Sequence, residues 1–278
     1  MEGPCWIFKA HLRNKEEWKV NNSESILTCN DICMYFGGVK AVDHFNMDVK
    51  EGITYGIIGP NGAGKTTIYN VFTRIYKQTA GTICFLGQSI DDCDQVAVAR
   101  MGMSRTFQNI RLFSGLSVLD NVKVALDHGG KYSISEAVLH LPRRQKEEKR
   151  IAEVAFETLK LLKLDCYADT LATSLPYGIQ RRVEIARALV SKPKLLLLDE
   201  PAAGLNPEEV LQLVDFLKEI KAIYPTLALI VIEHRMDLVM NLCNYLYVQN
   251  FGKTIAKGTP AEIQVNPDVL AAYLGEEE

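Results

Sequence analysis

The fold of this chain is decided by Ile53-Thr54-Tyr55-Gly56-Ile57-Ile58-Gly59-Pro60-Asn61-Gly62-Ala63-Gly64-Lys65-Thr66-Thr67. The first residues form an apolar, β-branched run, and the pattern G-x-x-x-x-G-K-[ST] follows directly. A helix start then follows over 67–72. This order predicts a buried parallel strand, a phosphate-binding loop and a helix. A chance match is disfavoured because the strand and the helix both fit.

The loop has the chemistry that phosphate groups require. Its glycines let the backbone curl so that consecutive N–H groups point at phosphate oxygens, and the helix N-terminus adds partial positive charge. We expect Lys65 to reach the β- and γ-phosphates and the Thr66 hydroxyl to ligate Mg²⁺. The residues expected to bind the nucleotide are Gly59, Pro60, Asn61, Gly62, Ala63, Gly64, Lys65, Thr66 and Thr67.

The composition limits the classes of protein to consider. With 278 residues the chain has room for one large α/β domain with an inserted subdomain, but two full nucleotide-binding domains would not fit. A net charge of −3 provides no basic field, which argues against a nucleic-acid partner. The longest apolar run lies around 227–232 and is much shorter than the roughly 18 residues of a membrane-spanning helix. Any membrane role must therefore come through partners.

The cysteines favour a structural interpretation. There are seven, without metal-site spacing, which indicates reduced thiols in a cytosolic protein. Cys29 and Cys33 lie four residues apart in an expected strand. Core or edge positions for these two thiols are favoured over a metal site.

The pattern along the chain predicts one α/β domain after an N-terminal extension. Residues 1–25 lack the apolar stretch of a signal peptide, and a poorly ordered extension or a start codon placed too early is favoured over an amphipathic helix that packs on another surface. The single domain is expected over 26–278, with a nucleotide-binding core over 26–88 and 190–278 and a mostly helical subdomain over 89–189. A small β layer precedes the phosphate loop. Expected strands lie at 26–29, 41–49, 81–87, 195–198 and 227–232, and expected helices open at Ser117 and span 142–164 and 207–223.

Two carboxylates follow the apolar strand at 195–198. Asp199 and Glu200 stand at its C-terminal end, where open parallel sheets bind ligands. Asp199 is placed to hold Mg²⁺, directly or through water. Glu200 can accept a proton from an attacking water, which is what hydrolysis requires beyond binding. Downstream of a phosphate loop, this pair predicts a nucleotide-hydrolysing site.

Three further segments resemble the ATP-binding cassette (ABC) ATPases. They are Arg105-Thr106-Phe107-Gln108, Leu175-Pro176-Tyr177-Gly178-Ile179-Gln180-Arg181-Arg182 and Val231-Ile232-Glu233-His234, and they occur in the family's order. The resemblance covers the chain from about residue 26 to its end. It implies a P-loop ATPase core with a small antiparallel β subdomain and an inserted helical subdomain.

The resemblance also implies roles for individual residues. Gln108 would join the metal site to a membrane partner, His234 would contact the γ-phosphate of ATP, and Phe36 would stack on adenine. Taken alone, His234 is typical of a strand-end histidine and Phe36 of a core aromatic. Only the ordered set of motifs favours the functional interpretation.

The helix at 175–182 resembles the family's signature helix, which faces the γ-phosphate held by a second ATPase subunit. Leu175, Pro176, Tyr177 and Gly178 are the residues expected to contact that nucleotide. Pro176 stands where the family usually has serine, and Ile179 replaces the usual glutamine. These departures change the segment of this chain that would contact the nucleotide in the other subunit's site.

Within the family, the chain resembles the ATP-binding subunits of branched-chain amino-acid importers. This rests on the signature tyrosine, on Arg111-Leu112-Phe113, on 201–207 and on the ending at 266–275. It implies ATP and Mg²⁺ at the site and attachment to membrane subunits on the cytoplasmic face of the cell membrane. It also implies a second ATPase subunit, with a heterodimer favoured over a homodimer, and an indirect link to an extracellular binding protein.

Other functions fit these features less well. A lipopolysaccharide-export ATPase would share a similar ending, but the segment ending at Gln108 argues against it. A soluble, non-transport ABC ATPase acting on ribosomes or DNA would usually carry two cassettes or long coiled insertions. A small-molecule kinase would need neither the signature segment nor His234.

Overall fold

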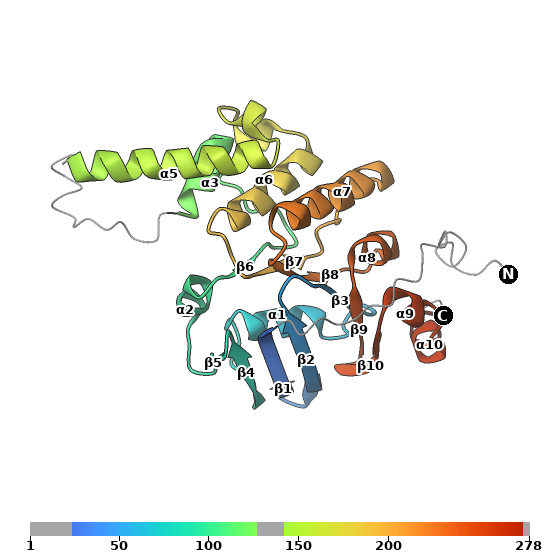
Figure 1. Ribbon diagram of the computed structural model, residues 1–278. Helices are drawn as coiled ribbons and strands as arrows, with labels where there is room; N and C mark the ends of the chain where they lie inside the picture. The colour runs from blue at the N-terminus through green and yellow to red at the C-terminus, as the bar shows by residue number, and fades with distance from the viewer. Residues whose placement is uncertain (1–23, 127–141, 275–278) are drawn as a thin grey trace.

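The structure is a computed structural model that describes residues 24–126 and 142–274 (Figure 1). Most of the expected N-terminal extension, residues 1–23, lies outside the described residues. Across the two described ranges, no helix is both long enough and apolar enough to cross a membrane.

A six-stranded sheet occupies the middle of the molecule, in the order β10-β9-β3-β8-β7-β6. All neighbouring strands are parallel except β10, which is antiparallel to β9. Strands β3, β7 and β8 are buried throughout, as expected for parallel strands covered on both faces. The bounds are β3 Thr54–Ile58, β6 Met103–Arg105, β7 Leu195–Asp199, β8 Ala228–Ile232, β9 Tyr245–Asn250 and β10 Lys253–Gly258.

A second, four-stranded sheet is antiparallel, in the order β2-β1-β4-β5. The long pair β1 and β2 has several register shifts, and Asp31 and His44 in these strands adopt positive φ. The bounds are β1 Ser25–Phe36, β2 Val39–Lys50, β4 Ala80–Phe85 and β5 Gln88–Ser89.

Helices cover the central sheet on the face opposite the small sheet. Figure 1 shows α3, α5, α6 and α7 on one side of it and α1 with the antiparallel strands on the other. The bounds are α1 Lys65–Phe72, α2 Gln95–Arg100, α3 Val118–Val124, α5 Pro142–Leu161, α6 Tyr177–Leu189, α7 Pro207–Ile223, α8 Met236–Leu242, α9 Pro260–Gln264 and α10 Pro267–Leu274, with 3-10 helices η2 Asp165–Tyr167 and η3 Ala172–Ser174.

Two hydrophobic cores lie on the two faces of the central sheet. Successive side chains of a strand point to opposite faces. Leu196 and Leu198 accordingly join the core of the helical side, while Leu195 and Leu197 join the core shared with α1 and the antiparallel sheet. The central strands are therefore continuous apolar runs, and the residues that follow the parallel strands lie at one edge of the sheet.

The expected α/β architecture, with an antiparallel β layer and an inserted helical part, is confirmed. The range 89–189 is nevertheless not confined to the helical layer, because it contains β6, which pairs with β7 in the central sheet. The helix expected over 142–164 is α5 and ends at Leu161.

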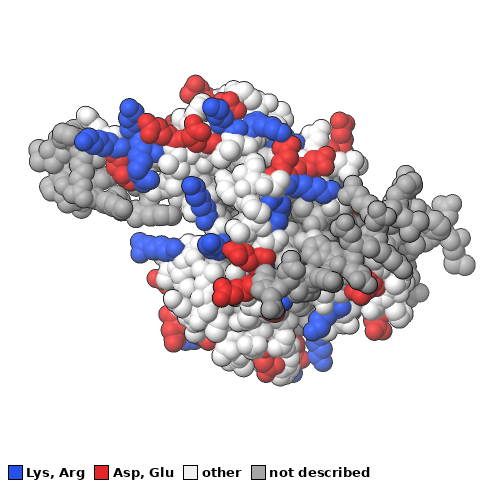
Figure 2. All heavy atoms as spheres, in the orientation of Figure 1, with Lys and Arg blue, Asp and Glu red and all other residues white. Residues whose placement is uncertain are grey.

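The charged face of α5 is solvated. Figure 2 shows basic and acidic side chains interspersed along this helix. Arg150 pairs with Glu147 at 2.6 Å, and Lys149 lies 4.0 Å from Glu153. Such a mixture offers no single-sign patch to an anionic partner.

Candidate nucleotide-binding site

Two glycines of the phosphate loop occupy positions that a side chain could not share. At Gly59, with φ of 147°, an added Cβ would lie 2.0 Å from the carbonyl oxygen of Gln249. At Gly64, with φ of 94°, it would lie 2.1 Å from the carbonyl oxygen of Ala41. Gly64 is also the N-cap of α1. The loop thus turns tightly from β3 into α1, which is the backbone arrangement that phosphate binding uses.

Lys65 lies inside this loop. The side chain is almost completely buried, and its Nζ donates to the carbonyl oxygens of Gly59 at 2.6 Å and Pro60 at 2.7 Å. Asn61 and Thr66 are exposed. The ammonium is therefore held beside the loop backbone, while the loop tip and the Thr66 hydroxyl are accessible to a ligand.

Three predicted residues meet just beyond the carboxyl ends of β7 and β8. Glu200 Oε2 accepts a hydrogen bond from Gln108 Nε2 at 2.7 Å, and His234 Nδ1 lies 3.8 Å from the same oxygen. Glu200 keeps 18% of its side chain exposed and His234 keeps 53%, so water can reach the carboxylate. Sequence segments more than 90 residues apart thus converge on one carboxylate.

The backbone at Glu200 is unusual. Its φ of 44° lies in the left-handed region, which non-glycine residues rarely adopt. The Glu200 N–H donates to the carbonyl oxygen of Ile232 at 2.9 Å and so holds this conformation. Strain of this kind clusters at functional sites.

Asp199 has a partner that the sequence motifs did not indicate. The Arg105 guanidinium donates to Asp199 Oδ2 at 2.7 Å, and both side chains are nearly buried. Arg105 also donates to Asn70 and Thr73 on and just after α1. The pair ties strand β6 to β7 and α1 below the phosphate loop.

The donor chemistry of the three predicted metal ligands suits a Mg²⁺ ion. Mg²⁺ prefers carboxylate, hydroxyl and amide oxygens. The described side-chain contact of Asp199 uses Oδ2, so Oδ1 is the oxygen that a metal would use. Gln108 donates through Nε2, which leaves its amide oxygen for a ligand role, and Thr66 presents an exposed hydroxyl. These are the three predicted metal ligands.

Glu233 is a functional candidate that the sequence analysis did not single out. It is fully buried, and its carboxylate accepts backbone N–H groups from Ala202, His234 and Arg235 at 2.7, 3.1 and 3.2 Å. Burial raises the pKa of this carboxyl against the lowering effect of those donors. Through these hydrogen bonds Glu233 connects the loop that follows Glu200 to the backbone of His234. It thereby fixes the distance between that loop and His234.

Phe36 stands at the end of β1 with 43% of its surface exposed. One edge contacts Tyr76, with ring centroids 5.3 Å apart. A half-exposed aromatic ring at a strand end is available for stacking, which is consistent with the adenine role implied by the resemblance.

The signature segment begins α6 in the helical layer. Pro176 is the N-cap and supplies no side-chain hydrogen bond to the helix. Leu175 is buried, and Tyr177 is 40% exposed. An added Cβ on Gly204 would lie 3.1 Å from the Tyr177 ring, so this tyrosine packs directly on the loop that follows Glu200.

Helix α6 also forms hydrogen bonds to the backbone around Gln108. The guanidinium of fully buried Arg181 donates to the carbonyl oxygens of Phe107 at 2.8 Å and Gln108 at 2.6 Å. It pairs with Glu184 at 2.7 Å, and Glu184 accepts the N–H of Arg111 at 3.2 Å. Burial raises the pKa of the Glu184 carboxyl, opposed by Arg181. The sequence signal for this anchor was the pair of arginines in the signature segment, but its target could not be read from it.

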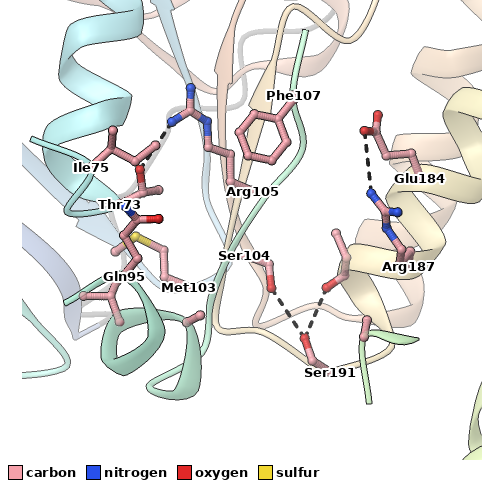
Figure 3. A pocket seen from close by; sticks show the side chains of 14 residues that line it. Thr73, Ile75, Gln95, Met103, Ser104, Arg105, Phe107, Glu184, Arg187 and Ser191 are labelled. Atoms are coloured by element: carbon pink, nitrogen blue, oxygen red, sulfur yellow. Dashed lines mark hydrogen bonds and ion pairs between the residues drawn. The ribbon is translucent and has the colours of Figure 1, made fainter. Parts of the chain in front are cut away.

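A groove of about 350 Å³ lies between the core and the helical layer. Figure 3 shows Thr73 and Arg105 on one side, Glu184 and Arg187 of α6 on the other, and Phe107 between them. Near the segment that carries Gln108, Phe113 is 50% exposed, whereas Leu112 is partly buried and packs on the helical core. The lining of the groove combines apolar side chains, such as Val98, Met103 and Phe107, with the charged side chains of Arg105, Glu184 and Arg187.

Comparisons with known proteins identify relatives that match about nine-tenths of the chain. The family described as "ABC transporter" matches residues 42–203. The family described as "Branched-chain amino acid ATP-binding cassette transporter" matches residues 253–278.

Two curated relatives carry informative names. The chain is 41% identical over 254 residues to the high-affinity branched-chain amino acid transport ATP-binding protein LivG of Salmonella typhimurium. The match covers 91% of this chain and 99% of LivG. It is 39% identical over 254 residues to BraF of Pseudomonas aeruginosa, named for the same transport, with the same coverage.

A solved structure agrees with these matches. The ADP conformation of MJ1267, an ATP-binding cassette of an ABC transporter, superposes with a TM-score of 0.79 at 33% identity. The match covers 91% of this chain and all of that one.

Proposed function

The chain belongs to the ABC transporter family, and we propose that it is the ATP-hydrolysing subunit of an importer for branched-chain amino acids. The observation that carries the hydrolytic part is the convergence of Gln108 and His234 on Glu200 beside the phosphate loop. The printed names of LivG and BraF support the choice of substrate class.

ATP is the substrate in this proposal. The phosphate loop and Lys65 would bind its phosphates, and Phe36 would stack on adenine. Glu200 would take a proton from the water whose oxygen attacks the γ-phosphorus, while the bond from that phosphorus to the β-bridging oxygen breaks. His234 would contact the γ-phosphate. When bound, Mg²⁺ would neutralise phosphate charge at Thr66, Asp199 and Gln108.

The partners are membrane subunits and a second ATPase subunit, on the cytoplasmic face of the membrane. The groove in Figure 3 fits a short helix from a membrane subunit, because its lining offers apolar side chains for contact and charged side chains that can pair with helix ends. Phe113 is 50% exposed at the rim of this groove, where its ring lies 5.9 Å from the guanidinium of Arg187, a lining residue. A helix seated there would contact the segment that carries Gln108 and so reach Glu200.

The proposal is tested by isolating the assembled complex. The tagged chain is purified from membranes of its source cells, the co-purifying chains are identified, and ATP-dependent uptake is measured in proteoliposomes. We expect membrane subunits, a second ATPase subunit and uptake of leucine, isoleucine or valine. Capture of lipopolysaccharide-export components, or ATP-driven transport of another solute only, would contradict the substrate class.

The docking surface is tested in the same assay. Phe113→Asp should reduce uptake while ATP hydrolysis by the complex continues, since the change alters the docking surface and leaves the catalytic residues intact. Phe156→Asp is the matched control, because Phe156 is 40% exposed on α5, away from the groove. Loss of folding in Phe113→Asp, seen by circular dichroism, would instead make Phe113 a core residue.

A further inference from the structure

The antiparallel sheet carries a cluster of metal-ligating side chains outside the nucleotide site. It consists of Cys33 in β1 and of Asp43 and His44 in β2. One sulfur, one carboxylate oxygen and one imidazole nitrogen from these residues all lie within 4.8 Å of one another. None of the three has a role in the ATPase proposal.

The backbone is bent to bring this cluster together. Asp31 and His44 adopt φ of 55° and 58°, both left-handed, where the pairing of β1 with β2 shifts register. Aspartate and histidine tolerate this region better than most residues. Bulges of this kind re-aim side chains and recur beside functional sites. Here the two bulges point Asp31 and His44 at each other.

The resulting contact fixes the histidine tautomer. His44 Nδ1 lies 2.6 Å from Asp31 Oδ1. An ionised carboxylate only accepts, so Nδ1 carries a proton in this contact, and in the neutral ring Nε2 then offers its lone pair to a metal. Nε2 lies 3.8 Å from Asp43 Oδ1. In many metal sites a histidine binds the metal through one ring nitrogen and donates the N–H of the other to a carboxylate. His44 has this arrangement, with Asp31 at Nδ1 and Asp43 facing Nε2.

The other two ligands are buried, and the histidine is open to solvent. Cys33 is 2% exposed, and its Sγ accepts the N–H of His44 at 3.4 Å. Asp43 is 6% exposed and accepts the Tyr35 hydroxyl at 2.9 Å. The His44 side chain is 64% exposed and borders a hollow of about 410 Å³ against β10. The hollow provides a path by which an ion could enter.

Nearby lysines offer a competing explanation for Asp43. Lys40 Nζ lies 3.5 Å from Oδ1 and Lys253 Nζ lies 3.9 Å from Oδ2. Both lysine side chains are more than half exposed, at 61% and 69%, so they can swing away. Ion pairing of Asp43 would explain neither the position of Cys33 nor the strained contact of Asp31 with His44.

We propose that this hairpin binds Zn²⁺ through Cys33 Sγ, Asp43 Oδ1 and His44 Nε2, with Asp31 as the outer carboxylate. A mixed sulfur, nitrogen and oxygen set suits zinc better than Mg²⁺ or Ca²⁺. Tetrahedral zinc holds such atoms about 3.3–3.6 Å apart, so small side-chain rotations close the site. Binding releases the Cys33 thiol proton to solvent.

The test uses the purified full chain without nucleotide. It is titrated with Co²⁺, which reports a thiolate ligand by its sulfur-to-metal absorption band, and then with Zn²⁺ against a chelating dye. We expect one equivalent bound with the band present. Cys33→Ser should abolish the band, and Asp31→Asn should weaken Zn²⁺ affinity by about 10- to 100-fold. Lys40→Met should strengthen affinity, because it removes a competing cation.

The controls keep the outcome decisive. Cys166→Ser alters an exposed thiol elsewhere and should leave band and affinity unchanged. His44→Gln and Asp31→Asn change exposed side chains, so they remain informative if Cys33→Ser fails to fold. Unchanged Zn²⁺ affinity in both of these variants, or a band that disappears with Cys166→Ser, would overturn the zinc site.

Discussion

Asp199 and Glu200 are adjacent in sequence but have opposite surroundings. Asp199 is nearly buried and paired with Arg105, whereas Glu200 is partly exposed, strained in backbone and contacted by Gln108 and His234. The motif alone predicted a metal ligand followed by a base. The Arg105 partner could not be predicted, because it reaches Asp199 from strand β6 across 94 residues of sequence. Two neighbouring carboxylates thus acquire different chemistry from tertiary contacts.

The Arg105 pair makes a prediction at this scale. Arg105→Met leaves the buried Asp199 carboxylate without its cation, so the free energy of unfolding should fall by about 3–5 kcal/mol. Mg²⁺ with ATP should restore more stability in this variant than in the parent, since the ion supplies the missing charge. Urea unfolding with and without Mg²⁺ and ATP measures both effects.

The matched control is Lys77→Met, which removes an exposed pair with Asp92. Exposed pairs contribute about 0–1 kcal/mol, so its loss should be small. Equal losses in the two variants would show that the Arg105 pair adds nothing beyond a surface contact.

At the scale of elements, α6 connects the signature segment to the segment that carries Gln108. Its first residues form the signature segment, and Arg181 one turn later donates to the carbonyl oxygens of Phe107 and Gln108. Gln108 in turn bonds Glu200. A shift of α6 would therefore move Gln108 relative to the Glu200 carboxylate.

Arg181→Met should separate binding from hydrolysis. ATP affinity should stay near the parent value because the phosphate loop is untouched, but turnover in the assembled complex should fall by about 10- to 100-fold through misplacement of Gln108. The single variant also strands the buried Glu184, so the double variant Arg181→Met with Glu184→Leu is the decisive one. Replacing both members of a buried pair restores stability. A stable double variant with parental turnover would contradict the positioning role.

Local signals predicted some elements well. The helix expected over 207–223 has those bounds because Asn206 forms a capping box with Glu209 and Pro207 occupies the first turn. Ser117 caps α3 as predicted. Strand β6 was missed because three residues inside a helical range become a strand only by pairing with β7. The bulges in β1 and β2 were missed for the same reason, since partner strands define register.

At the scale of the whole molecule, one chain supplies two halves of different sites. Its phosphate loop, Glu200 and His234 serve its own nucleotide, and its signature helix serves a second subunit in our proposal. Pro176 caps that helix without a hydroxyl or an N–H, both of which serine would offer to a γ-phosphate. A hydrogen bond to a charged group contributes about 1.5–3 kcal/mol, so the partner's site should be the weaker one.

Pro176→Ser should then raise ATPase activity of the complex, by up to about 10- to 150-fold at the partner's site. Serine is also a better helix N-cap than proline. Pro176→Ala is therefore the control, because alanine restores the backbone N–H but adds no hydroxyl. Steady-state ATPase assays of the complex compare the three proteins. The absence of any gain in Pro176→Ser would contradict the proposal that the partner's site is the weaker of the two nucleotide sites.

The most direct measurement of the central claim is ATP turnover by the assembled complex carrying Glu200→Gln. Glutamine keeps the shape and removes the proton acceptor, so turnover should fall by about 10²-fold or more while ATP still binds. Glu208→Gln, an exposed change in the first turn of α7, should leave turnover unchanged. Turnover of Glu200→Gln near the parental rate would show that Glu200 is not the base and that the proposed site does not hydrolyse ATP as described.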